Sequence, residues 1–230
     1  MRDILRNDDP AIHIDENISY ACLSQLQEES LEEEKTVYEI MQDAGFMTRD
    51  EVRRCLAKYC LSEECMDQKA GQLSGGEKNL LQIALMAASD AQLLILDEPT
   101  SGLDPVSRDE LLNVFREFVA DGKRSILFST HITSDLDKCA DYIMYIKDGC
   151  ILMNGDREEI IGGYRLVCGG KADMTPELEA ALIGVKETAF GFTGLIAERD
   201  LNAADGLQTA PADIESIMLY TEKYELNQEA

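Results

Sequence analysis

The sequence has few basic residues. Lysine and arginine together number 21, whereas aspartate and glutamate number 45, so the formal charge at pH 7 is −24. A surface that binds nucleic acid or anionic lipid needs clustered Lys and Arg to neutralise phosphate groups. The charge therefore predicts a soluble, acidic protein that has no nucleic-acid partner.

Long apolar runs and closely spaced cysteines are also missing. No run approaches the roughly 18 apolar residues that a membrane-spanning helix needs, and the N-terminus does not resemble a signal peptide. The 7 cysteines include no C-x-x-C pair. Cys55, Cys60 and Cys65 recur at every fifth position, which places them on different sides of a helix rather than around one metal ion. We therefore expect free thiols in a reducing cytoplasm and no zinc site.

The most informative stretch runs from Leu73 to Asp104 and opens with a glycine-rich turn. Ser74, Gly75 and Gly76 lead into a helix that we expect to begin near Glu77. The first turn of a helix has free backbone N–H groups and the positive end of the helix dipole, which together bind anions. The turn is therefore a candidate phosphate site.

Two apolar runs predict strands of a parallel sheet. The run 93–96 has no alternation of apolar and polar residues, which is typical of a strand buried on both faces, and it leads directly to Asp97 and Glu98. The run 125–130 predicts a second buried strand, followed by His131. Because ligands of open α/β sheets bind at the carboxyl ends of the strands, we expect all three side chains at one edge.

These segments resemble the characteristic motifs of the ABC ATPases. Residues 73–77, LSGGE, resemble the signature motif; residues 93–98 resemble the Walker B strand; and residues 101–104, SGLD, resemble the D-loop. The order and spacing of the segments also match that family. The resemblance implies ATP and Mg²⁺ as cofactors.

The resemblance also implies roles for single residues. Asp97 would hold Mg²⁺, Glu98 would polarise the water that attacks the γ-phosphate, and His131 would contact that phosphate. Gln25, which ends an expected strand over 20–25, would be the glutamine that touches the metal and the attacking water. The residues that would contact nucleotide are Ser74, Gly75, Gly76, Glu77 and Asp104.

The implied fold is α/β, with a P-loop-NTPase-like, mainly parallel sheet flanked by helices. Residues 1–164 would form a partial ABC ATPase domain, and its helical subdomain would span about 36–72, where two helical patterns are separated by Gly45. A helix is expected over 106–120. Such a helical subdomain carries the signature motif and docks against the membrane partner in this family.

Residues 165–230 would form a small α+β accessory tail, preceded by a hairpin that turns at 148–149. Within the tail, Thr175 and Pro176 are expected to start one helix and Pro211 another. The apolar residues between 190 and 196 are expected to form a strand.

The family's phosphate-binding loop, the Walker A motif G-x-x-x-x-G-K-[ST], has no counterpart. Only Gly45 and Gly71 precede the signature segment, and the run GGKA at 169–172 lacks the first glycine and the hydroxyl residue. We therefore expect a truncated N-terminal ATP-binding lobe. In the family, each ATP lies between the Walker A loop of one subunit and the signature motif of the other. The isolated chain is thus expected to be inactive, and a complete partner could supply the missing loop.

Three functions remain open. Residues after about 90 resemble ATPases of ABC-2-type exporters, which predicts an ATP-binding subunit that acts through a separate membrane permease at the cytoplasmic face of the membrane. The second is a non-hydrolysing regulatory or half-site partner of a complete ABC ATPase, in a homo- or heterodimer. The third is a translation-factor-like ABC protein, because residues before about 90 resemble that branch.

Overall fold

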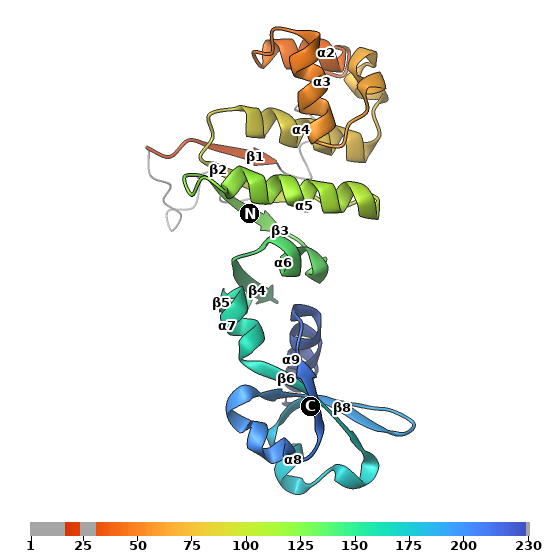
Figure 1. Cartoon of the computed structure of the whole chain (residues 1–230), viewed down its shortest axis with the longest axis vertical. Helices are drawn as coiled ribbons and strands as arrows, with labels where there is room; N and C mark the ends of the chain where they lie inside the picture. The colour runs from red at the N-terminus through yellow and green to blue at the C-terminus, as the bar shows by residue number, and fades with distance from the viewer. Residues whose placement is uncertain (1–16, 24–30, 229–230) are drawn as a thin grey trace. The chain divides into compact units, whose positions relative to one another are not determined.

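Figure 1 shows the computed structural model of the chain, which describes residues 17–23 and 31–228, with side chains up to residue 221. Its internal contacts divide it into two compact units, of which the first ends at His131 and the second begins at Ile132. The expected domain boundary at 164/165 lies later in the chain and stays a prediction. None of the helices in the described ranges is long and apolar enough to cross a membrane.

The first unit is built on a parallel sheet of the strands β1 (Tyr20–Leu23), β2 (Leu93–Asp97) and β3 (Ser125–Ser129), in the order β1-β2-β3. Leu93 lies opposite both Tyr20 and Ser125. The central strand β2 is the apolar run expected to be buried, and Leu94, Ile95 and Leu96 are at most 1 % exposed. The predicted α/β class with a parallel sheet is confirmed.

Strand β3 corrects one expectation, because it is not a buried strand. Within the described residues it pairs only with β2, so it forms an edge of the sheet. Its Leu127 side chain is 46 % exposed. An apolar run indicates burial only when other elements cover both faces of the strand, and within the described residues the side chains of Ser125 and Leu127, which share one face, are exposed.

Two short helices precede the signature segment, as the sequence pattern predicted. They are α2 (Val37–Asp43) and α3 (Arg49–Lys58), and each begins with a capping box, formed by Thr36 with Glu39 and by Thr48 with Glu51. In a capping box the side chain of each residue bonds the backbone N–H of the other, which fixes the start of the helix. Two 3₁₀ turns, η2 (Glu63–Asp67) and η3 (Ala70–Gln72), lead on to the signature segment.

Two longer helices flank the sheet of the first unit (Figure 1). They are α4 (Gly75–Ala88) and α5 (Pro105–Val119). Apolar residues recur on one face of each helix, as expected for an amphipathic helix packed on a core. The buried members are Leu80, Leu81, Ile83 and Ala84 in α4 and Leu111, Leu112, Val114, Phe115 and Phe118 in α5.

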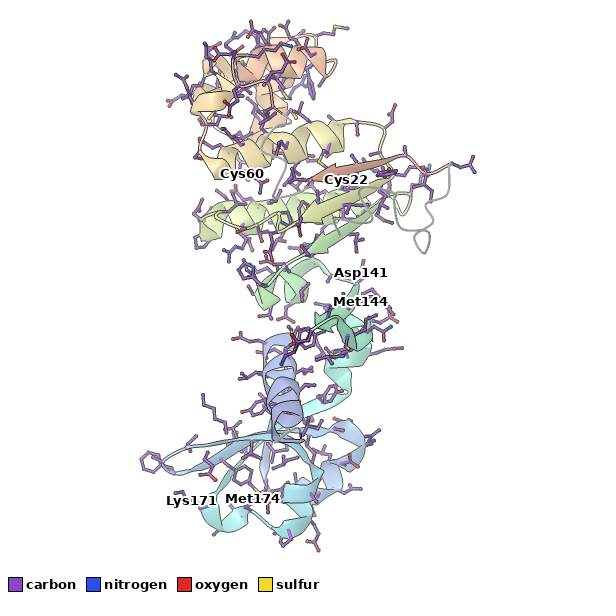
Figure 2. The ribbon with its side chains drawn as sticks, turned by 180° about the vertical axis from the view of Figure 1, so that it is seen from behind. Cys22, Cys60, Asp141, Met144, Lys171 and Met174 are labelled. Atoms are coloured by element: carbon purple, nitrogen blue, oxygen red, sulfur yellow. The ribbon has the colours of Figure 1, made fainter. Side chains whose placement is uncertain are left out.

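The second unit begins with α6 (Thr133–Cys139) and the hairpin of β4 (Tyr142–Lys147) and β5 (Cys150–Asp156). The hairpin turns at Asp148 and Gly149, whose φ angles are 49° and 79°, so the predicted turn is confirmed. Alternate residues of β4 are exposed, among them Tyr142 (56 %) and Met144 (51 %), and Figure 2 labels Met144. The helix α7 (Arg157–Gly162) follows the hairpin.

The rest of the second unit is a four-stranded antiparallel sheet with helices, which agrees with the expected α+β tail. Its strand order is β7-β8-β6-β9, with β6 (Tyr164–Gly170), β7 (Leu182–Glu187), β8 (Gly191–Ala197) and β9 (Gln208–Pro211). The helical elements between and after these strands are η4 (Lys171–Asp173), α8 (Pro176–Ala181), η5 (Glu198–Ala204) and α9 (Ile214–Gln228).

Two expectations in the tail were wrong, and each has a local cause. Pro211 does not start a helix but ends β9, opposite Arg165, because an edge strand tolerates a residue without an N–H. The final helix instead starts after Asp213, which accepts a hydrogen bond from the Ser216 N–H at 2.8 Å. Phe190 is not in a strand: it lies between β7 and β8, in a turn closed by the Thr188 N–H, which donates to the Gly191 carbonyl oxygen at 2.8 Å, and it is 94 % exposed.

Candidate functional site

The signature segment forms the start of α4, and Ser74 is its N-cap. The helix begins at Gly75, two positions before Glu77, because Ser74 and Glu77 form a capping box. The Glu77 carboxylate accepts hydrogen bonds from the Ser74 hydroxyl at 2.7 Å and from the Ser74 N–H at 2.8 Å. In return, the Glu77 N–H donates to the Ser74 hydroxyl oxygen at 3.3 Å. The polar groups of Ser74, in the turn expected to hold phosphate, are therefore hydrogen-bonded to the acidic side chain of Glu77.

The Glu77 carboxylate is held from both sides. The hydrogen bonds from the Ser74 hydroxyl and N–H lower the pKa of Glu77 against the raising effect of desolvation, so the group is ionised near neutral pH. Its second oxygen accepts a contact from the buried Cys65 thiol at 3.4 Å. Because the single hydroxyl proton of Ser74 is donated to Glu77, a phosphate at this turn must displace that carboxylate to receive it.

The two glycines of the turn have different surroundings. A Cβ atom added at Gly76 would lie 3.2 Å from Cδ2 of Leu103 and 3.7 Å from the carbonyl oxygen of Gly102, whereas one added at Gly75 would meet nothing within 4 Å. Gly76 therefore lets α4 start against the segment that resembles the D-loop, and Gly75 faces open space. The structure thus brings the signature and D-loop segments together.

Asp104, at the end of the D-loop segment, caps α5. Its carboxylate accepts from the Val106 N–H at 2.9 Å, from the Ser107 N–H at 3.2 Å and from the Ser107 hydroxyl at 2.6 Å. The Ser107 hydroxyl is the largest cause of the lowered pKa of Asp104, followed by these backbone N–H groups. The observed bonds assign Asp104 a structural task as a helix cap, and its contact with nucleotide stays a prediction.

The Walker B segment places two carboxylates at the carboxyl edge of the sheet. Asp97 is the last residue of β2 and lies opposite Ser129, whose hydroxyl donates to the Asp97 carboxylate at 2.5 Å. Glu98 follows in a left-handed conformation with φ of 49°, and its N–H bonds the carbonyl and hydroxyl oxygens of Ser129, each at 3.2 Å. The left-handed residue turns the chain sharply at the end of the strand, so the two acidic side chains leave it in different directions.

His131 joins this edge from the neighbouring strand. Its Nδ1 atom lies 2.7 Å from Oε2 of Glu98, and the side chains are 70 % and 21 % exposed. An exposed imidazole beside a partly covered carboxylate is a pair that can hold and transfer a proton. The expectation that the two strands bring these residues to one edge is thus met by the geometry.

A magnesium ion would suit the oxygen atoms at this edge. Mg²⁺ is held by one or two carboxylates together with water and substrate phosphates, and the Asp97 carboxylate with the Ser129 hydroxyl offers such atoms. Among the described residues, no group of three or more His, Cys, Asp or Glu side chains is arranged as a complete protein-built metal site.

Two residues complete the comparison of expectation and structure. Gln25 lies outside the described residues, so its role stays a prediction. The sequence analysis did not include Ser129 among the site residues. It could have done so, because Ser129 has a hydroxyl group and lies one position before the end of the expected strand over 125–130, which leads to the same edge as Asp97. The run GGKA at 169–172, rejected as a phosphate loop, starts with Gly169 and Gly170 in β6, paired with β8.

Comparison with known protein families finds similarity between residues 5 and 136 of the chain. Residues 5–101 match the family model described as ABC transporter, and residues 67–136 match a model described as AAA domain, putative AbiEii toxin, Type IV TA system. Residues 5–101 are thus similar to the ABC transporter family. This match includes the LSGGE and Walker B segments, so it supports their resemblance to the ABC ATPases.

Individual relatives of the ABC ATPase domain carry consistent names. The energy-coupling factor transporter ATP-binding protein EcfA2 of Bacillus subtilis is 34 % identical over 137 residues, which are 56 % of this chain and 49 % of that protein. EcfA3 of Oenococcus oeni is 36 % identical over 114 residues, 50 % of this chain and 39 % of that protein. The chain thus spans about half or less of the length of these curated relatives. Both names describe ATP-binding proteins of energy-coupling factor transporters, and neither describes an exporter or a translation factor.

One solved structure similar to this chain is the dimer of an ATP-binding cassette in a post-hydrolysis state bound to ADP and Pi. It shares 25 % sequence identity with this chain at a TM-score of 0.49, and the match covers 60 % of this chain and 63 % of that one.

Proposed function

We propose that this chain is an ATP-binding subunit of an ABC transporter, which couples ATP binding to transport through a separate membrane subunit at the cytoplasmic face of the membrane. The observation that carries the proposal is the arrangement of Asp97, Glu98 and His131 at one sheet edge, where Asp97 and Glu98 lie in the segment that matches the ABC transporter family model. ATP and Mg²⁺ would supply the phosphates and the charge neutralisation, and Asp97 is the residue that would hold the metal.

A second candidate is favoured by the signature turn, where Gly75 faces open space and leaves room for a facing loop. In this proposal the chain contributes only its signature side to a site whose Walker A loop comes from a complete ABC ATPase. Ser74, Gly75 and Gly76 would face that loop, while Glu98 and His131 of this chain would not take part in hydrolysis. The two proposals differ in which residues the ATPase activity depends on.

Binding of a fluorescent ATP analogue with Mg²⁺, measured with the purified chain alone and then with a complete ABC ATPase subunit, tests both proposals. We expect binding only with the partner, and we expect Ser74→Arg to abolish it while Ser89→Arg, at the other end of the same helix, leaves it unchanged. In the half-site proposal Glu98→Gln does not alter the ATPase rate of the pair, whereas in the first proposal it lowers that rate. Micromolar binding by the chain alone would refute the role given to the missing loop, and no binding in either case would refute both proposals.

We propose the groove between α2, α3 and α4 as the docking site for the membrane subunit. It has a volume of about 580 Å³, and small residues of α4, Ala84, Ala87 and Ala88, line it. Its lining also includes Met47, which is 80 % exposed. The charged lining residues are Arg54 and Lys58 with one acidic residue, Glu51, so the groove offers apolar contact beside a net positive charge in an otherwise acidic chain. A short cytoplasmic helix with an apolar face and an acidic end is the partner segment that fits it.

The docking proposal is tested by co-purification with the membrane subunit. Ala88→Arg places a large side chain in the groove and should abolish co-purification, whereas Ala180→Arg on the exposed surface of α8 should not. Retention of the complex by the Ala88 variant would exclude this groove.

Measuring the direction of transport would distinguish between the resemblance to exporter ATPases and the similarity to energy-coupling factor transporters. The segment after Gln92 resembles exporter ATPases, and the relatives named above belong to energy-coupling factor transporters. ATP-dependent accumulation of substrate in inside-out vesicles would support export, and accumulation in right-side-out vesicles energised from within would support import.

A further inference from the structure

A buried thiol lies behind the signature segment. Cys65 belongs to the 3₁₀ turn η2 and is 2 % exposed. Its Sγ atom lies 3.4 Å from Oε1 of Glu77 and 3.3 Å from Oγ of Ser62. The other carboxylate oxygen of Glu77, Oε2, accepts the two hydrogen bonds from Ser74. The Glu77 carboxylate therefore connects the turn expected to hold phosphate with a side chain of η2.

The thiol is the donor in its contact with Glu77. Burial is the largest cause of the raised pKa of Cys65, so the thiol keeps its proton near neutral pH. The Ser74 hydroxyl is the largest cause of the lowered pKa of Glu77, and an ionised carboxylate has no proton to donate. Because the single S–H proton goes to Glu77, the contact between Ser62 and the sulfur atom is donated by the Ser62 hydroxyl.

A phosphate at the signature segment would change the hydrogen bonds of Glu77. The Ser74 hydroxyl has one proton, so it can donate to Glu77 or to a phosphate but not to both. When it turns to a phosphate, Oε2 keeps only the bond from the Ser74 N–H. Leaving a partly covered carboxylate short of donors costs free energy, and a donor that stays on Oε1 reduces that cost.

The thiol differs in this respect from the residue next to it. Cys65 and Met66 are the two buried side chains of η2, at 2 % and 1 % exposed. Both fill space in the core, but only Cys65 has a polar hydrogen, and that hydrogen is directed at a carboxylate. Met66 is therefore the natural control, because it shares the burial and lacks the donor.

We propose that Cys65 is a positioning residue for Ser74. Its thiol holds the Glu77 carboxylate through Oε1, so that the Ser74 hydroxyl can leave Oε2 and donate to a phosphate of the nucleotide. Cys65 does not touch the nucleotide and acts through Glu77. The inference rests on the proposed function, because it requires the signature segment to contact phosphate. The hydrogen bond between the thiol and Glu77 needs no nucleotide, so it can be tested by itself.

Infrared spectroscopy of the purified chain tests that hydrogen bond. The S–H stretching band of Cys65 is obtained as the difference between the wild type and Cys65→Ala. The same difference in a Glu77→Gln background should lie at higher frequency, because a neutral amide accepts a weaker hydrogen bond than a carboxylate. In a Met66→Ala background the band should stay in place. A band that does not move in the Glu77→Gln background would overturn the proposal.

Binding of the fluorescent ATP analogue with Mg²⁺ to the pair of this chain and a complete ABC ATPase subunit tests the role of the thiol. We expect Cys65→Ala to raise the dissociation constant about three- to tenfold, as the loss of one hydrogen bond would. Cys65→Ser restores a donor and should bring the constant back towards the wild-type value. Met66→Ala should leave the constant unchanged, although it lowers the thermal unfolding midpoint.

The outcomes separate this inference from the proposed function. Unchanged binding in Cys65→Ala, or equal weakening in Cys65→Ala and Cys65→Ser, would overturn the role of Cys65 while the wild-type pair still binds ATP. No binding by the wild-type pair would refute the proposed function, and the positioning role would fall with it.

Discussion

The two glycines of the signature turn allow a matched test of the packing between α4 and the D-loop segment. Alanine is favoured over glycine inside a helix by up to about 1 kcal/mol. Gly75→Ala adds a methyl group in open space, so we expect it to stabilise the fold by a value in that range. Gly76→Ala adds the same methyl group 3.2 Å from Cδ2 of Leu103, a side chain that is only 9 % exposed.

Overpacking a buried contact costs about 1–3 kcal/mol, which exceeds the gain in helix propensity. We therefore expect Gly76→Ala to be less stable than Gly75→Ala by about 1–3 kcal/mol and to lie near or below the wild type. Urea unfolding followed by far-UV circular dichroism is the assay, since the chain contains no tryptophan for a fluorescence signal.

Leu103→Ala provides the internal control for this prediction. On its own it should destabilise the fold, because it removes a buried side chain. In its presence the methyl group at position 76 has no crowded neighbour, so the penalty of Gly76→Ala should disappear, and a double-mutant cycle measures that coupling. Equal stabilisation by Gly75→Ala and Gly76→Ala, or the absence of coupling to Leu103, would refute the contact.

Three further predictions follow from the caps and thiols. Ser74→Ala removes the N-cap of α4 and should lower the free energy of unfolding by about 1 kcal/mol in the same urea assay, whereas unchanged stability would contradict the capping box. Because the folded-state pKa of Asp104 is lowered, its stabilising contribution is complete above its ordinary value of 3.8 and is lost as pH falls through the folded-state pKa. Asp104→Asn should therefore flatten the acid limb of the stability profile below pH 3.8, and an unaltered limb would count against the cap. Burial raises the pKa of Cys60, labelled in Figure 2, to about 12, so at pH 8 it should react with iodoacetamide more slowly than the exposed Cys150 and Cys168, as peptide mass spectrometry would show.

The parts of the site that depend on short-range patterns could be predicted from the sequence. The uninterrupted apolar run before Asp97 identified β2, and the end of the next apolar run brought His131 to the same edge as Glu98. The start of α4 was expected two residues too late, although Ser74 and Glu77 have the spacing of a capping box, which would have placed it correctly.

The parts that depend on neighbours distant in sequence could not be predicted in the same way. The exposure of Leu127 depends on which strands lie beside β3, and its own sequence reads like that of a buried strand. The position of Pro211 depends on its pairing with Arg165, which lies in a different strand. The bond from Ser129 to Asp97 depends on the register of two strands, and a single-strand pattern contains no information on register.

The open edge at β3 has a consequence for handling the protein. Among the described residues β3 pairs on one side only, and an edge strand that also exposes a leucine is a template for edge-to-edge aggregation. The net charge of −24 opposes that association at low ionic strength, but the screening length shrinks to about 3 Å in 1 M salt. We therefore expect concentrated salt to precipitate this chain, and a lysine at position 127 to keep it in solution under the same conditions.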